Sequence, residues 1–277
     1  LLSLHQAVKM GANVAQVFLR DMSSASPKGR IELSPQEIRA VRLFIQEHQL
    51  HVFVHASYLL HFCRHEIGYG GIQWAYQILR EDMALAEELG MKGVVLHMCS
   101  TKRVPPKGSS HPDTRTIKET QESMVGHIQY FLSTYGQEFP NVTLLLENSA
   151  GEHSRIGKNL KELGAVYKPL HRKFPGKVGI CLDTCHAFAA GNHIHTPKGL
   201  RSFFTTYQKE VGPLSSLHLI HLNDSAHPFD SKKDRHTGLG QGHLFSNTTG
   251  QKTLRELVLF CAKNSIPLCL ETHANYK

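Results

Sequence analysis

The sequence predicts an α/β fold in which parallel strands alternate with helices and close into a barrel. Seven short apolar runs recur along the chain with helical patterns between them, and six of the runs end in histidine, aspartate or glutamate. Strands separated by helices pair in parallel, and polar residues at strand carboxyl ends are how a parallel barrel builds its active site. A doubly wound open sheet is the alternative. The barrel is preferred because these strand ends are spread over the whole sequence.

The apolar runs are the expected strands. The first, AQVFLR, ends at Arg20 and carries no potential metal ligand. The other six end at His55, His97, Glu147, Asp183, His221 and Glu271. The chain opens on a helical pattern over residues 4–10, so an eight-stranded barrel would need one more strand before Leu1. We therefore expect one domain over residues 1–277, a TIM-type (β/α)8 barrel whose first strand is missing from the given chain.

Capping signals delimit the helices between these strands. Ser34–Glu37 and Thr116–Glu119 are capping boxes, and Thr196-Pro197 places an N-cap residue before proline at the first helical position. Gly90 follows a helical pattern and predicts its end. Apolar residues at helical spacing mark the bodies of these helices and of two more, within residues 38–45, 79–86, 125–132, 160–167, 203–207 and 254–261.

Composition indicates a soluble, basic enzyme of the cell interior. No apolar run approaches the roughly 18 residues needed to span a bilayer, and the start LLSLHQAV lacks the features of a signal peptide. Six cysteines without a CxxC pair are expected to be reduced thiols, with Cys185 the one to test for reactivity. We therefore expect an intracellular protein, of the cytoplasm or nucleus, with no membrane partner. The net charge of +8 favours a polyanionic partner without choosing one.

Nine residues are candidate metal ligands, because Asp183-x-x-His186 and Asp234-x-His236 add imidazoles and carboxylates to the strand ends. The nine are His55, His97, Glu147, Asp183, His186, His221, Asp234, His236 and Glu271. Imidazole nitrogen and carboxylate oxygen without thiolate suit Zn²⁺, Mn²⁺ or Fe²⁺ at a catalytic site. Nine ligands are too many for one ion and indicate two or three ions with a bridging carboxylate. Such sites serve phosphoryl-ester hydrolysis, which agrees with basic residues in the strand-to-helix loops.

The chain resembles endonuclease IV, the zinc-dependent apurinic/apyrimidinic endonucleases of DNA base-excision repair. The motifs that carry the resemblance are HASYL from His55, LENSAG from Leu146, GICLDTCHAFAAG from Gly179, HLNDS from His221, DRHTGLGQG from Asp234 and LCLET from Leu268. The resemblance runs from about Leu4 to Thr272, and it implies an eight-stranded α/β barrel.

The resemblance also implies three zinc ions. The first would be held by His55, His97 and Glu147. The second would be held by Glu147, Asp183, His221 and Glu271. The third would be held by His186, Asp234 and His236. Glu147, Asp183 and Glu271 are the implied catalytic residues, with Glu147 bridging two ions.

The implied substrate is duplex DNA that contains an abasic site, cut by a zinc-activated hydroxide on the 5′ side to leave a 3′-hydroxyl and a 5′-deoxyribose phosphate. Removal of blocking groups from 3′ ends is an expected companion activity, and the chain is expected to act as a monomer. Tyr58 and Leu59 would wedge into the DNA. The basic residues expected to contact phosphates are Lys102, Lys232, Lys233 and Arg235. An inserted basic residue is left open between Lys28 and Arg30.

Two other functions compete with this prediction. A divalent-metal sugar isomerase or epimerase on the same barrel would need only Glu147, Asp183, His221 and Glu271. The remaining candidates, such as His55 and Asp234, have no role in such an isomerase. A nucleic-acid-binding protein with structural zinc is disfavoured, because closed structural sites are usually rich in cysteine.

Overall fold

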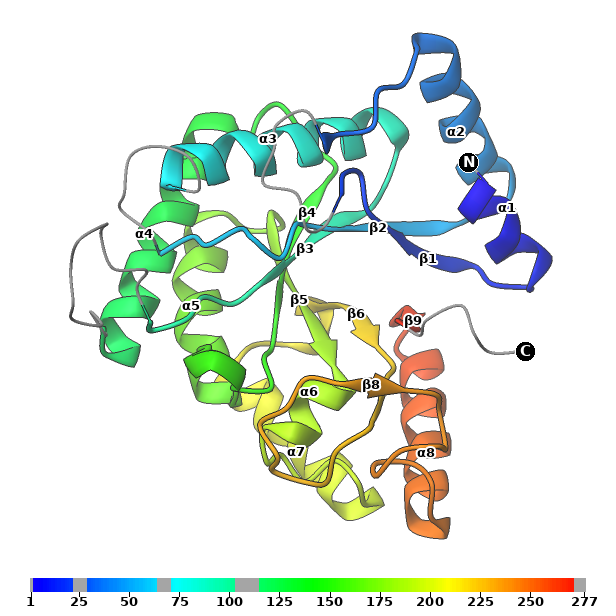
Figure 1. The fold of residues 1–277 in the computed structure, drawn as a ribbon, viewed down its shortest axis with the longest axis vertical. Helices are drawn as coiled ribbons and strands as arrows, with labels where there is room; N and C mark the ends of the chain where they lie inside the picture. Colours follow the sequence, from blue (N-terminus) through cyan, green and yellow to red (C-terminus); the bar gives the residue numbers. More distant parts are fainter. Residues whose placement is uncertain (1, 22–28, 64–70, 103–114, 272–277) are drawn as a thin grey trace. The chain divides into compact units, whose positions relative to one another are not determined.

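The computed structural model describes residues 2–21, 29–63, 71–102 and 115–271, in which helices and strands alternate along the chain (Figure 1). Two compact units are formed. The first comprises Leu1–His97, Ser123–Leu145 and Leu170–Val178, and the second Met98–Glu122, Leu146–Pro169 and Gly179–Lys277. Among the described residues, no helix combines the length and the apolar character needed to cross a membrane. The organisation as one domain over residues 1–277 stays a prediction.

The strands and helices of the described residues have the following bounds. The strands are β1 Val14–Val17, β2 His51–His55, β3 Gly93–His97, β4 Thr143–Glu147, β5 Val178–Asp183, β6 Leu217–His221, β7 Asp224–Ser225, β8 His236–Thr237 and β9 Leu268–Cys269. The helices are α1 Leu2–Lys9, α2 Pro35–Glu47, α3 Ile72–Leu89, α4 Ile117–Tyr135, α5 Leu160–Lys173, α6 Thr184–Ala189, α7 Pro197–Glu210 and α8 Thr248–Lys263.

In the first unit, parallel strands follow one another in chain order. β1 pairs with β2, and β2 with β3, where His55 stands opposite Val95. The inner residues of β2 and β3 are almost fully buried, which matches their unbroken apolar sequences. Because the strands are parallel and in register, the residues that end β2 and β3 lie at the same edge of the sheet.

In the second unit, β6 lies between β5 and β9, and both pairs are parallel. The register places Asp183 opposite His221 and His221 opposite Cys269. β7 and β8 form a short antiparallel pair that joins Ser225 to His236. The strand register therefore brings the end of β5 level with the end of β6.

The capping predictions are confirmed. Ser34 and Glu37 form a reciprocal capping box at the start of α2, and Thr116 and Glu119 make the same bonds before α4. Thr196 caps α7 through the Gly199 N–H. Gly90 ends α3 at a φ of 75°, in the left-handed region that glycine adopts most readily. These helix starts and this helix end are therefore encoded locally.

In the part of the chain that the structure describes, seven strands of one sheet are found where the seven apolar runs predict them, with two corrections at strand ends. β1 stops at Val17 and not at Arg20, because Arg20 forms an isolated antiparallel bridge with Arg30. β9 stops at Cys269 and not at Glu271, because the Glu271 N–H donates to the Asn223 side chain. In both cases the backbone leaves the strand to make another hydrogen-bonded contact.

Candidate metal centre

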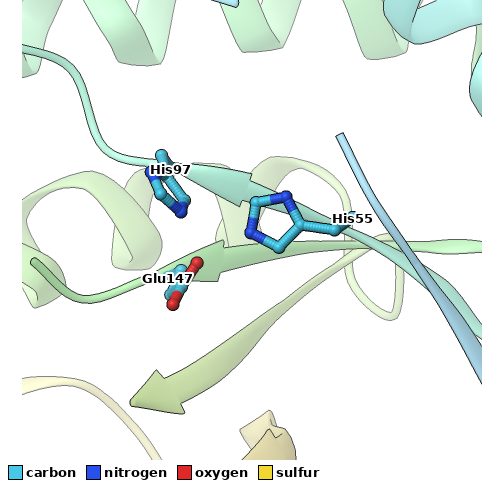
Figure 2. A group of neighbouring side chains, drawn as sticks. All are labelled: His55, His97 and Glu147. Atoms are coloured by element: carbon cyan, nitrogen blue, oxygen red, sulfur yellow. The ribbon is translucent and has the colours of Figure 1, made fainter. Parts of the chain in front are cut away.

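The first group of candidate ligands consists of His55, His97 and Glu147, which end β2, β3 and β4. One ligand atom from each lies within 4.8 Å of the others, and Figure 2 shows the His55 ring directed toward His97 and the Glu147 carboxylate. The His55 Nδ1 lies 2.7 Å from the Ala56 carbonyl oxygen. An Nδ1–H donated to that carbonyl leaves Nε2 as the metal-binding nitrogen.

Tyr58 packs its ring against the imidazoles of His55 and His97. Its centroid lies 5.0 Å from that of His55 and 5.2 Å from that of His97. The two imidazole centroids are 4.8 Å apart, with ring planes nearly perpendicular. Tyr58 is 41% exposed and its neighbour Leu59 is 36% exposed. A partly exposed aromatic ring thus lies beside the first ligand group, and a partly exposed leucine follows it in the sequence.

The second group consists of Glu147, Asp183, His221 and Glu271, with one ligand atom of each within 4.8 Å of the others. His221 Nδ1 lies 3.1 Å from a Glu147 oxygen, 3.0 Å from a Glu271 oxygen and 4.0 Å from an Asp183 oxygen. Glu147, Asp183 and His221 are buried and Glu271 is half-buried. Three carboxylates therefore surround one buried imidazole.

The third group consists of Asp183, His186 and His236. Asp234 lies beside it, with one oxygen 3.0 Å from His186 Nε2 and the other 3.3 Å from His236 Nε2. Asp183 lies 3.5 Å from the same His236 nitrogen. The nine predicted ligands therefore gather into overlapping sets in which Glu147 and Asp183 are each shared. The sequence-based assignment gave the third ion His186, Asp234 and His236. In the structure Asp183 belongs to this group as well.

The carboxylates and imidazoles perturb one another strongly. Burial raises the pKa of Asp183, although His186 and His236 counteract it. Burial alone would lower the pKa of His186, but the Asp183 and Asp234 carboxylates outweigh it and hold that pKa well above its ordinary value. The pKa of His236 is about 9, because Asp183 and Asp234 overcome the effect of burial. Opposing shifts of this kind are typical of functional sites.

The same donors fit divalent metal ions. Buried carboxylates need a positive charge close by, and these carboxylates accordingly raise the pKa of His186, His221 and His236 above the ordinary value of histidine. A divalent cation would supply that charge and be held by imidazole nitrogen and carboxylate oxygen. The absence of cysteine from the three groups matches the ligand set of a catalytic and not a structural zinc site.

The sequence prediction missed Asn148 and Glu152, which hydrogen-bond to candidate ligands. The Asn148 side chain accepts from the Asp183 N–H and donates to the Asp183 carbonyl, and the Asn148 carbonyl lies 2.9 Å from His186 Nδ1. Glu152 accepts a hydrogen bond from the backbone N–H of Asp234 at 3.1 Å. Asn148 stands next to Glu147 in LENSAG, so its adjacency to a ligand was the available signal.

Asp224 was also missed, although it lies in the HLNDS motif. Its buried carboxylate accepts hydrogen bonds from five backbone N–H groups, those of Ser225, Gly240, Gly242, Leu244 and Phe245. A Cβ on Gly242 would lie 2.3 Å from the Ser225 carbonyl oxygen and 2.6 Å from an Asp224 oxygen. Asp224 therefore folds the segment after His236 back onto β7, and Gly242 makes that approach possible.

The basic residues expected to contact DNA differ in how they are held. Lys102 and Lys233 are exposed. Lys232 donates to the Ala190 carbonyl and pairs with Asp230, whereas Arg235 lies 3.4 Å from Glu152. Lys28 lies outside the described residues, and Arg30 is half-buried next to the Arg20 bridge. Lys102 and Lys233 present their charge most openly.

Cys185 lies in surroundings that disfavour the reactive thiolate form. All six cysteines are buried thiols. Burial raises the pKa of Cys185, and the neighbouring Asp183 carboxylate raises it further. A raised pKa disfavours the thiolate form needed for reactivity, and the spectator role of Cys185 stays a prediction.

A family model described as a xylose isomerase-like TIM barrel matches residues 4–248. Probable endonuclease 4 of Aquifex aeolicus (strain VF5) is 31% identical over 275 residues, which cover 98% of this chain and 87% of the relative. Probable endonuclease 4 of Nitrosopumilus maritimus (strain SCM1) is 28% identical over 273 residues, covering 98% of this chain and 88% of the relative.

Solved structures share the fold. Endonuclease IV from Thermus thermophilus aligns with a TM-score of 0.77 at 24% identity and covers 99% of this chain and 87% of that chain. A D-tagatose 3-epimerase-like protein aligns with a TM-score of 0.62 at 15% identity over 97% of this chain and 85% of that chain. The family-model match and the relative at 31% identity show that this chain has the TIM barrel fold and belongs to the endonuclease 4 family.

Proposed function

We propose that the chain hydrolyses the phosphodiester bond on the 5′ side of an abasic site in duplex DNA. The products are a 3′-hydroxyl and a 5′-deoxyribose phosphate, and blocked 3′ ends are a second substrate of the same site. The observation that carries this proposal is the overlap of three candidate ligand groups through Glu147 and Asp183, in a chain of the endonuclease 4 family. Multinuclear sites of this kind suit phosphate-ester hydrolysis.

Three zinc ions are the proposed cofactors. His55, His97 and Glu147 would hold the first. Glu147, Asp183, His221 and Glu271 would hold the second. His186, His236 and Asp234 would hold the third, with Asp183 close by. Zinc, when bound, lowers the pKa of water and neutralises charge on a phosphate.

The protein residues in turn fix where that chemistry acts. Glu147 and Asp183 each belong to two of the candidate ligand groups, so each would serve two neighbouring ions. Catalysis rests on these two carboxylates and on Glu271. The Nδ1 contacts of His55 and His186 with backbone carbonyls orient both rings. Ligands held in this way need little rearrangement when phosphate charge develops in the transition state.

DNA recognition is assigned to the exposed side chains described above. Tyr58 packs beside the His55 ring, and its neighbour in sequence, Leu59, is also partly exposed, so the two offer apolar surface where a sugar without a base could be extruded. Extrusion costs least where no base is stacked or paired. Lys102 and Lys233 are placed to contact phosphates, with Lys232 and Arg235 in the same segment as Lys233. Binding should therefore weaken as salt rises. A monomer is sufficient for this function.

A sugar isomerase or epimerase is the second candidate function. The observation that favours it is that Glu147, Asp183, His221 and Glu271 form a complete ligand group by themselves. His55 and His97 count against it, because together with Glu147 they make a further group for which an isomerase has no need. The epimerase-like structure shares the fold alone.

The experiment is nicking of a duplex that carries one tetrahydrofuran abasic analogue, with the intact duplex as the matched control. We expect a single cut on the 5′ side of the analogue without added Mg²⁺. Strong chelation should abolish it and Zn²⁺ should restore it. Metal analysis of the purified chain should return about three zinc ions per chain.

Two results would contradict the proposal. Equal nicking of the abasic and intact duplexes would remove the substrate assignment. Interconversion of ketose epimers by the metal-loaded chain, without nicking of either duplex, would establish the isomerase instead.

A further inference from the structure

We propose that Asn223 is a positioning residue that holds the Asp183 and Glu271 carboxylates in the arrangement that binds metal. Asn223 follows β6 and is fully buried. Its Nδ2 donates to Asp183 Oδ2 at 2.5 Å and to Glu271 Oε2 at 3.0 Å. One amide group therefore connects two carboxylates that are 88 residues apart in the sequence (271 minus 183).

The orientation of this amide is determined by its other hydrogen bond. The oxygen and nitrogen of an asparagine side chain are assigned from their partners. Asn223 Oδ1 accepts from the Glu271 backbone N–H at 3.0 Å. An N–H can meet only an acceptor, so the oxygen must face Glu271 N and the NH₂ must face the carboxylates. No flipped amide satisfies both ends.

The backbone of Asn223 is held as firmly as its side chain. Thr184 Oγ1 donates to the Asn223 carbonyl at 2.6 Å and accepts from the Asn223 N–H at 2.9 Å. Thr184 directly follows Asp183, the last residue of β5. Asn223 thus links the ends of β5, β6 and β9 and has no freedom to turn away.

The chemical effect follows from the neutrality of the amide. Two carboxylates placed close together repel each other, and one then tends to keep a proton. The Asn223 NH₂ hydrogen-bonds one oxygen of each carboxylate without adding charge. The same two oxygens face the other candidate ligands, because Asp183 Oδ2 lies 3.5 Å from His236 Nε2 and Glu271 Oε2 lies 3.0 Å from His221 Nδ1. A carboxylate oxygen has more than one acceptor position, so the bond from Asn223 fixes its direction and still allows it to meet a cation. Partners of metal ligands that orient them in this way commonly contribute about 10- to 100-fold to metal affinity.

The inference rests on the proposed zinc centre, and its test is zinc affinity in the absence of DNA. The dissociation constants for Zn²⁺ are measured by competition with a chromophoric chelator. The variants are Asn223→Ala, which removes every side-chain bond, and Asn223→Asp, which keeps an acceptor for Glu271 N–H but removes both donors. We expect each variant to release one zinc equivalent with affinity lowered about 10- to 100-fold. The value of kcat should fall more than KM changes.

Asn192 supplies the matched control. It lies in the same unit, and its Nδ2 donates only to backbone carbonyls in the bonds found, those of Lys158 and Ala187. Asn192→Ala and Asn192→Asp should leave zinc affinity within about twofold of the unsubstituted chain, a difference of less than about 0.5 kcal/mol.

The outcomes separate the two proposals. Zinc affinity of Asn223→Asp equal to or above that of the unsubstituted chain would overturn the positioning role, even if Asn223→Ala fails to fold. A chain that binds zinc and loses it in both Asn223 variants, yet does not nick abasic DNA, would keep this inference and overturn the proposed function.

Discussion

The end of β2 and the ends of β5, β6 and β9 hold their candidate ligands by different means. His55 is fixed by a carbonyl of its own loop and by the faces and edges of aromatic rings, one of which, Tyr58, is 41% exposed. Asp183 and Glu271 are fixed by a buried amide with a single possible orientation. The first region has a ligand beside a surface that can meet a substrate. The second has ligands whose positions are fixed by hydrogen bonds from a buried side chain.

The difference indicates a division of labour. Aromatic contacts are worth about 0.5–1.5 kcal/mol each and tolerate small displacements, whereas buried, fully satisfied polar networks specify one geometry. Recognition is expected to depend on the first region and reactivity on the second. Glu147 belongs to a ligand group of each region, so its substitution should affect both.

Glu147→Gln should give the largest effect. Glutamine keeps the size of the side chain but cannot carry the charge shared by two ligand groups. Loss of several kcal/mol of transition-state stabilisation corresponds to about a 10³-fold fall in kcat. The measurement is single-turnover cleavage of the abasic duplex with metal content determined in parallel. Unimpaired cleavage would show that the two groups do not depend on a shared carboxylate.

A substitution of Asp82 tests whether the buried ion pair of the first unit stabilises the fold and leaves metal binding unaffected. Arg20 Nε lies 2.8 Å from Asp82, and both side chains are buried. Burial raises the pKa of Asp82 to about 6, against the opposing effect of Arg20. The folded state therefore holds the proton more tightly than the unfolded state, whose pKa is near 3.8.

This stabilising contribution is complete below pH 3.8 and is lost as pH rises through about 6. The loss is about 3 kcal/mol for a shift of about two units. Asp82→Asn should remove that part of the pH dependence, as urea unfolding between about pH 4 and pH 7 would show. A variant that keeps the full slope would place its origin in another group. Zinc content should stay unchanged if Asp82 serves only the fold.

Tyr58→Ala should give the smallest effect, and on binding more than on the chemical step. Loss of one aromatic contact with DNA corresponds to about 1–2 kcal/mol, or a Kd about 5- to 30-fold weaker. Fluorescence anisotropy with a labelled abasic duplex at constant salt would measure it, and Tyr58→Phe is the matched control. A larger change in zinc affinity than in DNA affinity would mean that the ring mainly supports His55 and His97.

The strands and the ligand set were predictable because both are encoded locally. An apolar run such as VGICLD carries its own ligand at its end, and Asp183 is found at the end of β5 as expected. Capping boxes likewise act over three residues, so Ser34 and Thr116 were sufficient to predict where their helices begin. Parallel pairing then brings such strand ends to one edge without further information from the sequence.

The supporting residues were not predictable for the opposite reason. Asn148, Asn223 and Asp224 act through partners 16 to 48 residues away, and nothing in their immediate sequence states those distances. The ends of β1 and β9 were predicted wrongly for the same reason, because they depend on contacts with distant residues. Glu271 leaves β9 because its N–H finds Asn223, a choice that only the tertiary structure offers.

The hydrogen bonds of Asp224 have a consequence for the order in which the chain folds. Its partners beyond Ser225 lie 16 to 21 residues ahead in the sequence, whereas those of Asn223 lie 40 residues back and 48 residues ahead. Closing a shorter loop costs less chain entropy, although the cost grows only slowly with length. On a ribosome that synthesises the chain from its N-terminus, the Asp224 turn is complete once Phe245 has emerged. The hydrogen bonds between Asn223 and Glu271 can form only after Glu271 has been synthesised, a further 26 residues on (271 minus 245). The candidate metal centre is therefore completed after the turn beside it.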